Sequence, residues 1–133
     1  MPRILLIDDD DLLRGVLAKA LTHAGHTVLQ AGDGQQGVDV ARATEVDLVI
    51  TDLVMPVKEG VETILLLKRE RPQLPVIAIS GGVSNSPLYL DIASRMGARR
   101  VLAKPFMPQE LIQTIEQVLA EAAAERPKSS ESR

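Results

Sequence analysis

Five short apolar runs divide the 133-residue sequence, and longer stretches of helical periodicity lie between them. Most of the runs are continuous rather than alternating, which is typical of strands covered on both faces of a parallel sheet. The second run is weaker and is therefore expected at an edge of the sheet. The predicted strands occupy residues 4–7, 27–29, 48–50, 76–79 and 101–103.

The stretches between and after these runs carry apolar residues three and four positions apart, which predicts amphipathic helices. We expect them within residues 12–21, 35–43, 59–71, 87–96 and 111–122. Gly25 and Gly97 are placed to end the first and fourth helices. This order predicts an α/β fold, (βα)5, with a doubly wound parallel five-stranded sheet in the flavodoxin-like strand order 2-1-3-4-5.

The composition is that of one globular domain, with 45% hydrophobic and 25% charged residues. The chain has no Cys, which excludes disulfides and thiolate metal sites, and its net charge of −3 argues against a nucleic-acid-binding surface. No apolar run approaches the ~18 residues that a membrane span needs. We therefore expect a cytoplasmic domain over residues 1–125 and a polar tail or truncated linker over residues 126–133.

Polar side chains follow four of the five predicted strands. A run of four Asp residues at 8–11 follows the first strand, Asp52 the third, Ser80 the fourth and Lys104 the fifth. Ligands of open parallel sheets bind at the carboxyl ends of the strands, where the strand order reverses. Because the first and third strands are neighbours in the order 2-1-3-4-5, the acidic run and Asp52 are expected to converge there.

Converging carboxylates need a positive charge among them. Two carboxylates ~4 Å apart repel by about 4 kcal/mol at an effective dielectric of about 20. Mg²⁺ suits Asp8, Asp9 and Asp52, because it binds few carboxylates together with water and phosphate oxygens. A hard cation, a carboxylate nucleophile, a Lys and a hydroxyl are sufficient for in-line phosphoryl transfer. The pattern therefore predicts phosphoryl chemistry at Asp52.

Each of these residues also has an ordinary structural interpretation. Asp is favoured at helix N-caps and first turns, which is how we interpret Asp10 and Asp11. Asp52 could be a turn residue, and Lys104 an ordinary surface lysine. Polar residues of these kinds at the carboxyl ends of four strands of one sheet nevertheless favour a functional site over coincidence.

Four stretches of the chain resemble the receiver domain of two-component response regulators, the CheY-like family. They read ILLIDDDDLLR (4–14), DLVITDLVMPVKEG (47–60), PVIAIS (75–80) and GARRVLAKPF (97–106). The resemblance implies a phosphoacceptor module that signals to a protein partner by a conformational change. Such a module is not an enzyme beyond its own phosphorylation and dephosphorylation.

The resemblance also implies a Mg²⁺ site. Asp8 and Asp9 would bind the ion, and Asp52 would be both a ligand and the phosphoacceptor. The backbone carbonyl of Val54 would complete the protein ligands.

Two more residues have an implied role in holding the phosphoryl group. Ser80 would hydrogen-bond one phosphoryl oxygen, and Lys104 would pair with another. The Lys104–Pro105 peptide is expected to be cis, which the chemistry of proline permits. The implied phosphodonor is a histidine kinase or a His-containing phosphotransfer protein, with an unidentified downstream protein as output and no nucleic acid or membrane bound by this domain.

The chain departs from the family pattern at several positions. Val101 replaces the usual aromatic residue three positions before Lys104, which puts the usual Ser-to-aromatic switch in doubt. Val54 is apolar and Gly82 has no side chain where the family often positions the hydrolytic water. We therefore expect the phosphoryl group to be comparatively long-lived.

Other interpretations stay open. Residues 32–37 fit the dinucleotide-binding pattern GxGxxG, although a Gly-rich turn between strand and helix is enough to explain them. Asp8-x-Asp10 resembles the start of a haloacid-dehalogenase-type phosphatase motif. A receiver-like protein-binding module without phosphorylation is the third alternative. His23 and His26 are expected at the surface around a turn.

Overall fold

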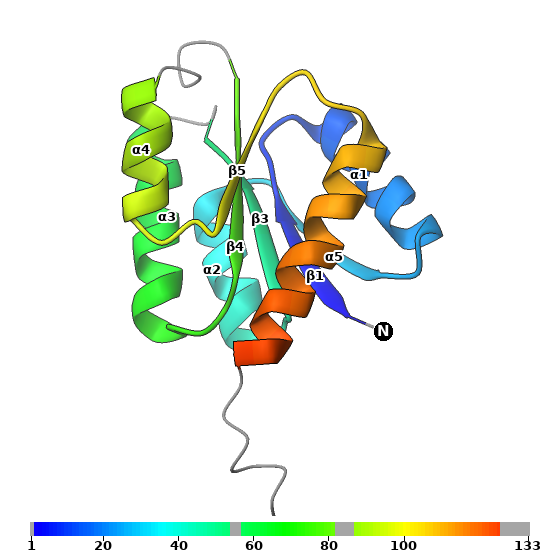
Figure 1. The fold of residues 1–133 in the computed structure, drawn as a ribbon, viewed down its shortest axis with the longest axis horizontal. Helices are drawn as coiled ribbons and strands as arrows, with labels where there is room; N and C mark the ends of the chain where they lie inside the picture. Colours follow the sequence, from blue (N-terminus) through cyan, green and yellow to red (C-terminus); the bar gives the residue numbers. More distant parts are fainter. Residues whose placement is uncertain (1, 54–56, 82–86, 126–133) are drawn as a thin grey trace, which may run out of the picture.

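The computed structural model describes residues 2–53, 57–81 and 87–125, in which five strands alternate with five helices (Figure 1). The strands are β1 (Arg3–Ile7), β2 (Thr27–Ala31), β3 (Leu48–Asp52), β4 (Val76–Ser80) and β5 (Arg100–Ala103). The helices are α1 (Asp11–His23), α2 (Gly34–Ala43), α3 (Val57–Glu70), α4 (Pro87–Arg95) and α5 (Pro108–Glu125). The expected tail at 126–133 lies outside the described residues.

The five strands pair in parallel in the order β2-β1-β3-β4-β5, so the predicted flavodoxin-like topology is confirmed. β2 lies at an edge, as its weaker apolar run indicated. The register pairs Ile7 of β1 with Thr51 of β3. The next residues along these neighbouring strands, Asp8 and Asp52, therefore leave the sheet side by side at its carboxyl edge.

Helices cover both faces of the sheet, with α1 and α5 on one face and α2, α3 and α4 on the other (Figure 1). On the first face, strand residues pack with Leu21 of α1 and Ile115 of α5. On the second, they pack with Val38 of α2, Ile64 of α3 and Ala93 of α4. β3 and β4 are buried along their whole length, which explains why their apolar runs do not alternate.

The ends of the helices follow local sequence signals. The side chain of Asp10 caps α1 by accepting a hydrogen bond from the Leu13 N–H at 3.0 Å, as the sequence predicted for this residue. Gly25 and Gly97 come just after α1 and α4, with φ angles of 104° and 120°. Only Gly adopts these angles without strain, so both helices end where expected.

The GxGxxG stretch at 32–37 forms the turn into α2. Asp33 caps this helix by accepting a hydrogen bond from the Gln36 N–H at 2.8 Å. A Cβ on Gly37 would lie 2.3 Å from Cδ1 of Ile7, which is fully buried in β1. Gly37 thus has a packing reason: α2 lies too close to the sheet for a side chain at this position.

The prediction for His26 is wrong. Its side chain is only 7% exposed, whereas His23 is exposed as expected. The turn after α1 folds back on the helix, because the His26 N–H donates to the Leu21 carbonyl at 3.1 Å, and this tucks the imidazole inside. Neither ring nitrogen has a hydrogen-bond partner among the described residues.

Within residues 2–53, 57–81 and 87–125, no helix is long and apolar enough to span a membrane.

Candidate functional site

The carboxyl edge of the sheet brings together side chains from β1, β3 and the segment after β5. Asp52 is the last residue of β3 and is 1% exposed. Its Oδ2 accepts a hydrogen bond from Nζ of Lys104 at 2.7 Å, so the two side chains form an ion pair that is sheltered on the Asp52 side. The predicted meeting of Asp52 and Lys104 is therefore present.

The path of Lys104 depends on its neighbours in the fold. Its backbone N–H donates to the Ser80 carbonyl at 2.7 Å, just past the end of β5. A Cβ on Gly81 would lie 3.2 Å from Cβ and Cδ of Lys104, so the glycine leaves room for the lysine stem to cross β4. The Lys104–Pro105 peptide is cis, as the family resemblance implied.

Asp8 is the second buried carboxyl of the site, with 1% exposure. Its Oδ1 accepts a hydrogen bond from the Asp10 N–H at 2.9 Å, whereas its Oδ2 is buried without a partner in the described part of the chain. Burial raises the pKa of Asp8 from 3.8 to about 6; the Asp10 N–H opposes this, and the adjacent Asp52 carboxylate adds to it. The site therefore holds two buried carboxyl groups, Asp8 and Asp52, with Lys104 as the one cation paired to them among the described residues.

These features fit a hard divalent cation. An unpartnered buried carboxylate oxygen beside a second carboxylate is the donor set that Mg²⁺ accepts, with water filling its other positions. Asp9 follows directly, but its side chain is exposed, and the predicted ligand Val54 lies outside the described residues. Within residues 2–53, 57–81 and 87–125, no group of three or more acidic, His or Cys side chains could hold a metal by itself. A bound ion would thus depend on water or phosphate oxygens as well.

Ser80 and Val101 lie on the two strands beyond β3. Ser80 is the last residue of β4, is fully buried and follows Ile79, which pairs with Asp52. Its position at the site edge is the one predicted, while its role toward a phosphoryl group stays a prediction. Val101 is partly buried on β5 and packs against the core on the α4 face of the sheet. That position therefore holds a small packed side chain.

Sequence reasoning missed one residue beside the acidic loop. Arg14 of α1 donates from Nη1 to the backbone carbonyl of Asp8 at 2.6 Å and from Nε to Oε1 of Gln30 at 3.1 Å. The sequence offered only the spacing of Asp11 and Arg14, which lie three positions apart on a predicted helix. That spacing usually indicates no more than an ion pair at the surface. The contact with Gln30 depends on the tertiary fold.

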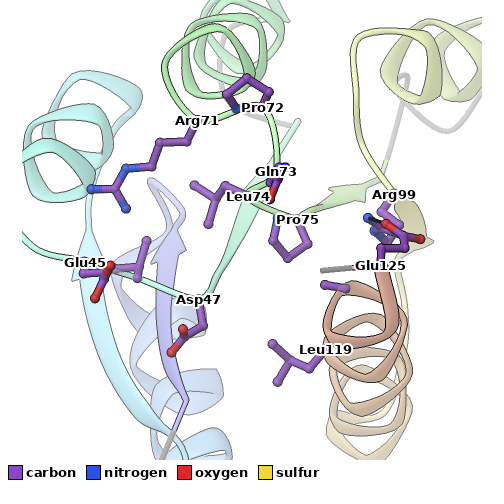
Figure 2. Close-up of a pocket in the computed structure, with 12 residues that line it drawn as sticks. Glu45, Asp47, Arg71, Pro72, Gln73, Leu74, Pro75, Arg99, Leu119 and Glu125 are labelled. Atoms are coloured by element: carbon purple, nitrogen blue, oxygen red, sulfur yellow. Dashed lines mark hydrogen bonds and ion pairs between the residues drawn. The ribbon is translucent and has the colours of Figure 1, made fainter. Parts of the chain in front are cut away.

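A cavity of about 590 Å³ lies at the opposite end of the sheet, where the strands begin (Figure 2). Its walls come from the segments that precede β3, β4 and β5 and from the end of α5. Arg99 and Glu125, which meet at its edge, are already bound to each other at 2.8 Å. Asp47 accepts a hydrogen bond from the Arg3 N–H at 2.7 Å. None of the predicted site residues lines this cavity.

Residues 4–116 match the family described as the response regulator receiver domain. The chain belongs to this family. Receiver domains that resemble it occur inside longer proteins, and it is 39% identical over 118 residues to the DNA-binding transcriptional regulator NtrC of Bradyrhizobium sp. (strain RP501 Parasponia). It is also 36% identical over 104 residues to the autoinducer 1 sensor kinase/phosphatase LuxN of Vibrio harveyi.

These matches cover most of the receiver chain and a small part of each relative. They include 89% of this chain and 24% of NtrC, and 78% of this chain and 12% of LuxN. A solved receiver domain protein (CheY-like) from Methanospirillum hungatei JF-1 matches with a TM-score of 0.88 and 25% identity, over 95% of this chain and 99% of that one. The resemblance to two-component response regulators stated from the sequence is therefore confirmed, and so is the fold.

Proposed function

We propose that this receiver domain accepts a phosphoryl group on Asp52, with Mg²⁺ bound at Asp8, Asp9, Asp52 and the Val54 carbonyl. The observation that carries the proposal is the buried Asp52, whose carboxylate lies beside Asp8 on one side and is held by Lys104 at 2.7 Å on the other. A buried acidic pair with one lysine and one unpartnered oxygen has little structural purpose, because it destabilises the fold unless a cation binds.

The donor would be a phosphohistidine on a histidine kinase or on a His-containing phosphotransfer protein in the cytoplasm. One carboxylate oxygen of Asp52 forms a bond to phosphorus while the phosphorus–nitrogen bond of the donor breaks, and the product is an acyl phosphate on Asp52. When bound, Mg²⁺ supplies charge neutralisation at the phosphoryl oxygens. Lys104 fixes the carboxylate through Oδ2 and supplies a second positive charge.

The signal would leave the domain through a downstream protein. Ser80, at the end of β4, would hydrogen-bond a phosphoryl oxygen on Asp52 and thereby bias the conformation of the segment that follows it. With Val101 in place of an aromatic residue, the change would not depend on a ring moving beside β5. As in receiver domains generally, we propose no turnover of a separate substrate.

Intact mass after incubation with acetyl phosphate and MgCl₂ tests the proposal, with Asp52→Asn as the matched variant. The wild type should gain the mass of one phosphoryl group, and neither the variant nor the wild type with excess EDTA should gain it. A wild type that stays unlabelled would favour a protein-binding module that is not phosphorylated. Continuous release of phosphate from a phosphoester, without labelling, would favour the phosphatase.

A further inference from the structure

The side chain of Arg14 connects the acidic loop to the edge strand β2. Its Nη1 donates to the Asp8 carbonyl at 2.6 Å and lies 2.8 Å from Oδ1 of Asp11, and its Nε donates to Oε1 of Gln30 at 3.1 Å. Gln30 belongs to β2, two strands away from Asp52. Although α1 is a surface helix, the Arg14 side chain is only 16% exposed. One guanidinium therefore holds groups from three parts of the chain.

The contact with Asp8 continues the hydrogen bonding of the sheet past its last pair. Ile7 pairs with Ala31, and the Asp8 N–H then donates to the Ala31 carbonyl at 3.1 Å. β2 ends at Ala31, so Arg14 takes the place of the strand as the partner of the Asp8 carbonyl. Both backbone polar groups of Asp8 are thus fixed. Because the carbonyl of Asp8 and the N–H of Asp9 share one peptide plane, the direction in which the chain enters Asp9 is fixed with them.

We propose that Arg14 is a positioning residue for the metal site: it orients the Asp8–Asp9 peptide and thereby raises the affinity of the site for Mg²⁺ without contacting the ion. The inference rests on the proposed function, since it concerns the same site. Groups that orient metal ligands through hydrogen bonds typically account for about 10- to 100-fold in metal affinity. Arg14 would orient the proposed metal ligands Asp8 and Asp9 through the backbone carbonyl of Asp8, and not through a carboxylate.

The direction in which the Mg²⁺ affinity changes when Arg14 is removed distinguishes a positioning role from a simple electrostatic one. Arg14 is a positive charge near the acidic pair, so its removal should strengthen Mg²⁺ binding if charge alone mattered. If Arg14 positions the loop, its removal should weaken binding. The ion pair with Asp11 is not what matters, because Asp11 is 85% exposed and such surface pairs contribute little.

Three variants separate these possibilities. Arg14→Met keeps a long side chain with high helix propensity but has no donors. Arg14→Lys keeps the charge but lacks the planar fork that reaches two acceptors at once. Asp11→Asn removes the exposed ion pair and leaves the contacts with Asp8 and Gln30 in place. Isothermal titration with MgCl₂ alone gives the affinity of each folded protein, and amide chemical shifts of Asp9 and Asp10 report the loop without any phosphodonor.

Arg14→Met should weaken Mg²⁺ binding about tenfold or more. Arg14→Lys should also bind Mg²⁺ more weakly than the wild type, because its charge alone does not orient the peptide. Asp11→Asn should bind Mg²⁺ as tightly as the wild type. Urea unfolding without Mg²⁺ completes the set, because a purely structural role would lower stability and leave the affinity of the folded protein unchanged. Unchanged or tighter binding by Arg14→Met, with normal binding by the wild type, overturns this inference alone. A wild type that does not bind Mg²⁺ overturns the proposed function and this inference together.

Discussion

Replacing Asp8 by Asn should make the metal-free protein more stable. The substitution preserves the shape of the side chain, and an amide oxygen can still accept the hydrogen bond from the Asp10 N–H. It removes a buried negative charge beside Asp52, and it places an N–H donor where the unpartnered Oδ2 now lies. A site that had evolved for stability alone would not be improved by this change.

The pKa of Asp8 gives the size and the sign of the effect. The pKa rises from 3.8 to about 6 on folding, mainly through burial, and a difference of about two pH units corresponds to about 3 kcal/mol. Below both pKa values Asp8 is protonated in the folded and in the unfolded state, so it does not lower the free energy of unfolding. Between them the folded state holds more protons, so stability falls as the pH rises, and above about 6 the full cost is present. Asp8→Asn should therefore gain up to about 3 kcal/mol near pH 8 and almost nothing near pH 4.

Urea unfolding with EDTA at about pH 8 and about pH 4 measures this gain. Asp11→Asn is the control, because Asp11 lies in the same acidic run but is 85% exposed, and its change should stay within about 0.5 kcal/mol. Added MgCl₂ should stabilise the wild type through binding to the folded state and should stabilise Asp8→Asn much less. The reasoning fails if Asp8→Asn is less stable than the wild type near pH 8, or if its gain is the same at both pH values.

Three other buried positions should change the stability of the protein when they are substituted. Lys104→Met removes the cation that pairs with the buried Asp52 carboxylate and should lower the free energy of unfolding by about 3 kcal/mol in EDTA; an unchanged urea midpoint would contradict this. Thr51→Val should raise it by about 1 kcal/mol, because the Thr51 hydroxyl is buried without a partner in the described part of the chain; a loss of stability would reveal a hydrogen bond there. Gly37→Ala should lower the melting temperature despite the better helix propensity of Ala, since the new Cβ would lie 2.3 Å from Cδ1 of Ile7, and a higher melting temperature would disprove the close contact.

The sequence was most informative where a local pattern of residues has a single physical cause. Continuous apolar runs predicted five buried parallel strands, and Gly25 and Gly97 marked helix ends because a positive φ favours Gly. The meeting of Asp52 and Lys104 was predictable as well, because the strand order places the ends of distant strands at one edge. Such features depend on the backbone topology, which the periodicity of the sequence already specifies.

The sequence was less informative where a side chain is placed by tertiary packing. His26 follows a glycine in a turn and has the polarity of a surface residue, yet the turn folds the ring inside. The position of the Arg14 side chain involves Gln30 of β2, a contact that no local pattern indicates. The exposed side chain of Asp9 also differs from the buried one of Asp8, although the two are adjacent and have the same chemistry. Which of two adjacent acids turns inward is decided by the tertiary fold around the end of β1.

Chemical trapping of the acyl phosphate tests the central claim most directly. Borohydride reduction of an aspartyl phosphate leaves homoserine, which tandem mass spectrometry can place in the sequence. After treatment with acetyl phosphate and MgCl₂, homoserine should be found at position 52 alone, and excess EDTA should abolish it. Homoserine at Asp8 or Asp9, or none at Asp52 when Mg²⁺ is present, would contradict the assignment of the phosphoacceptor.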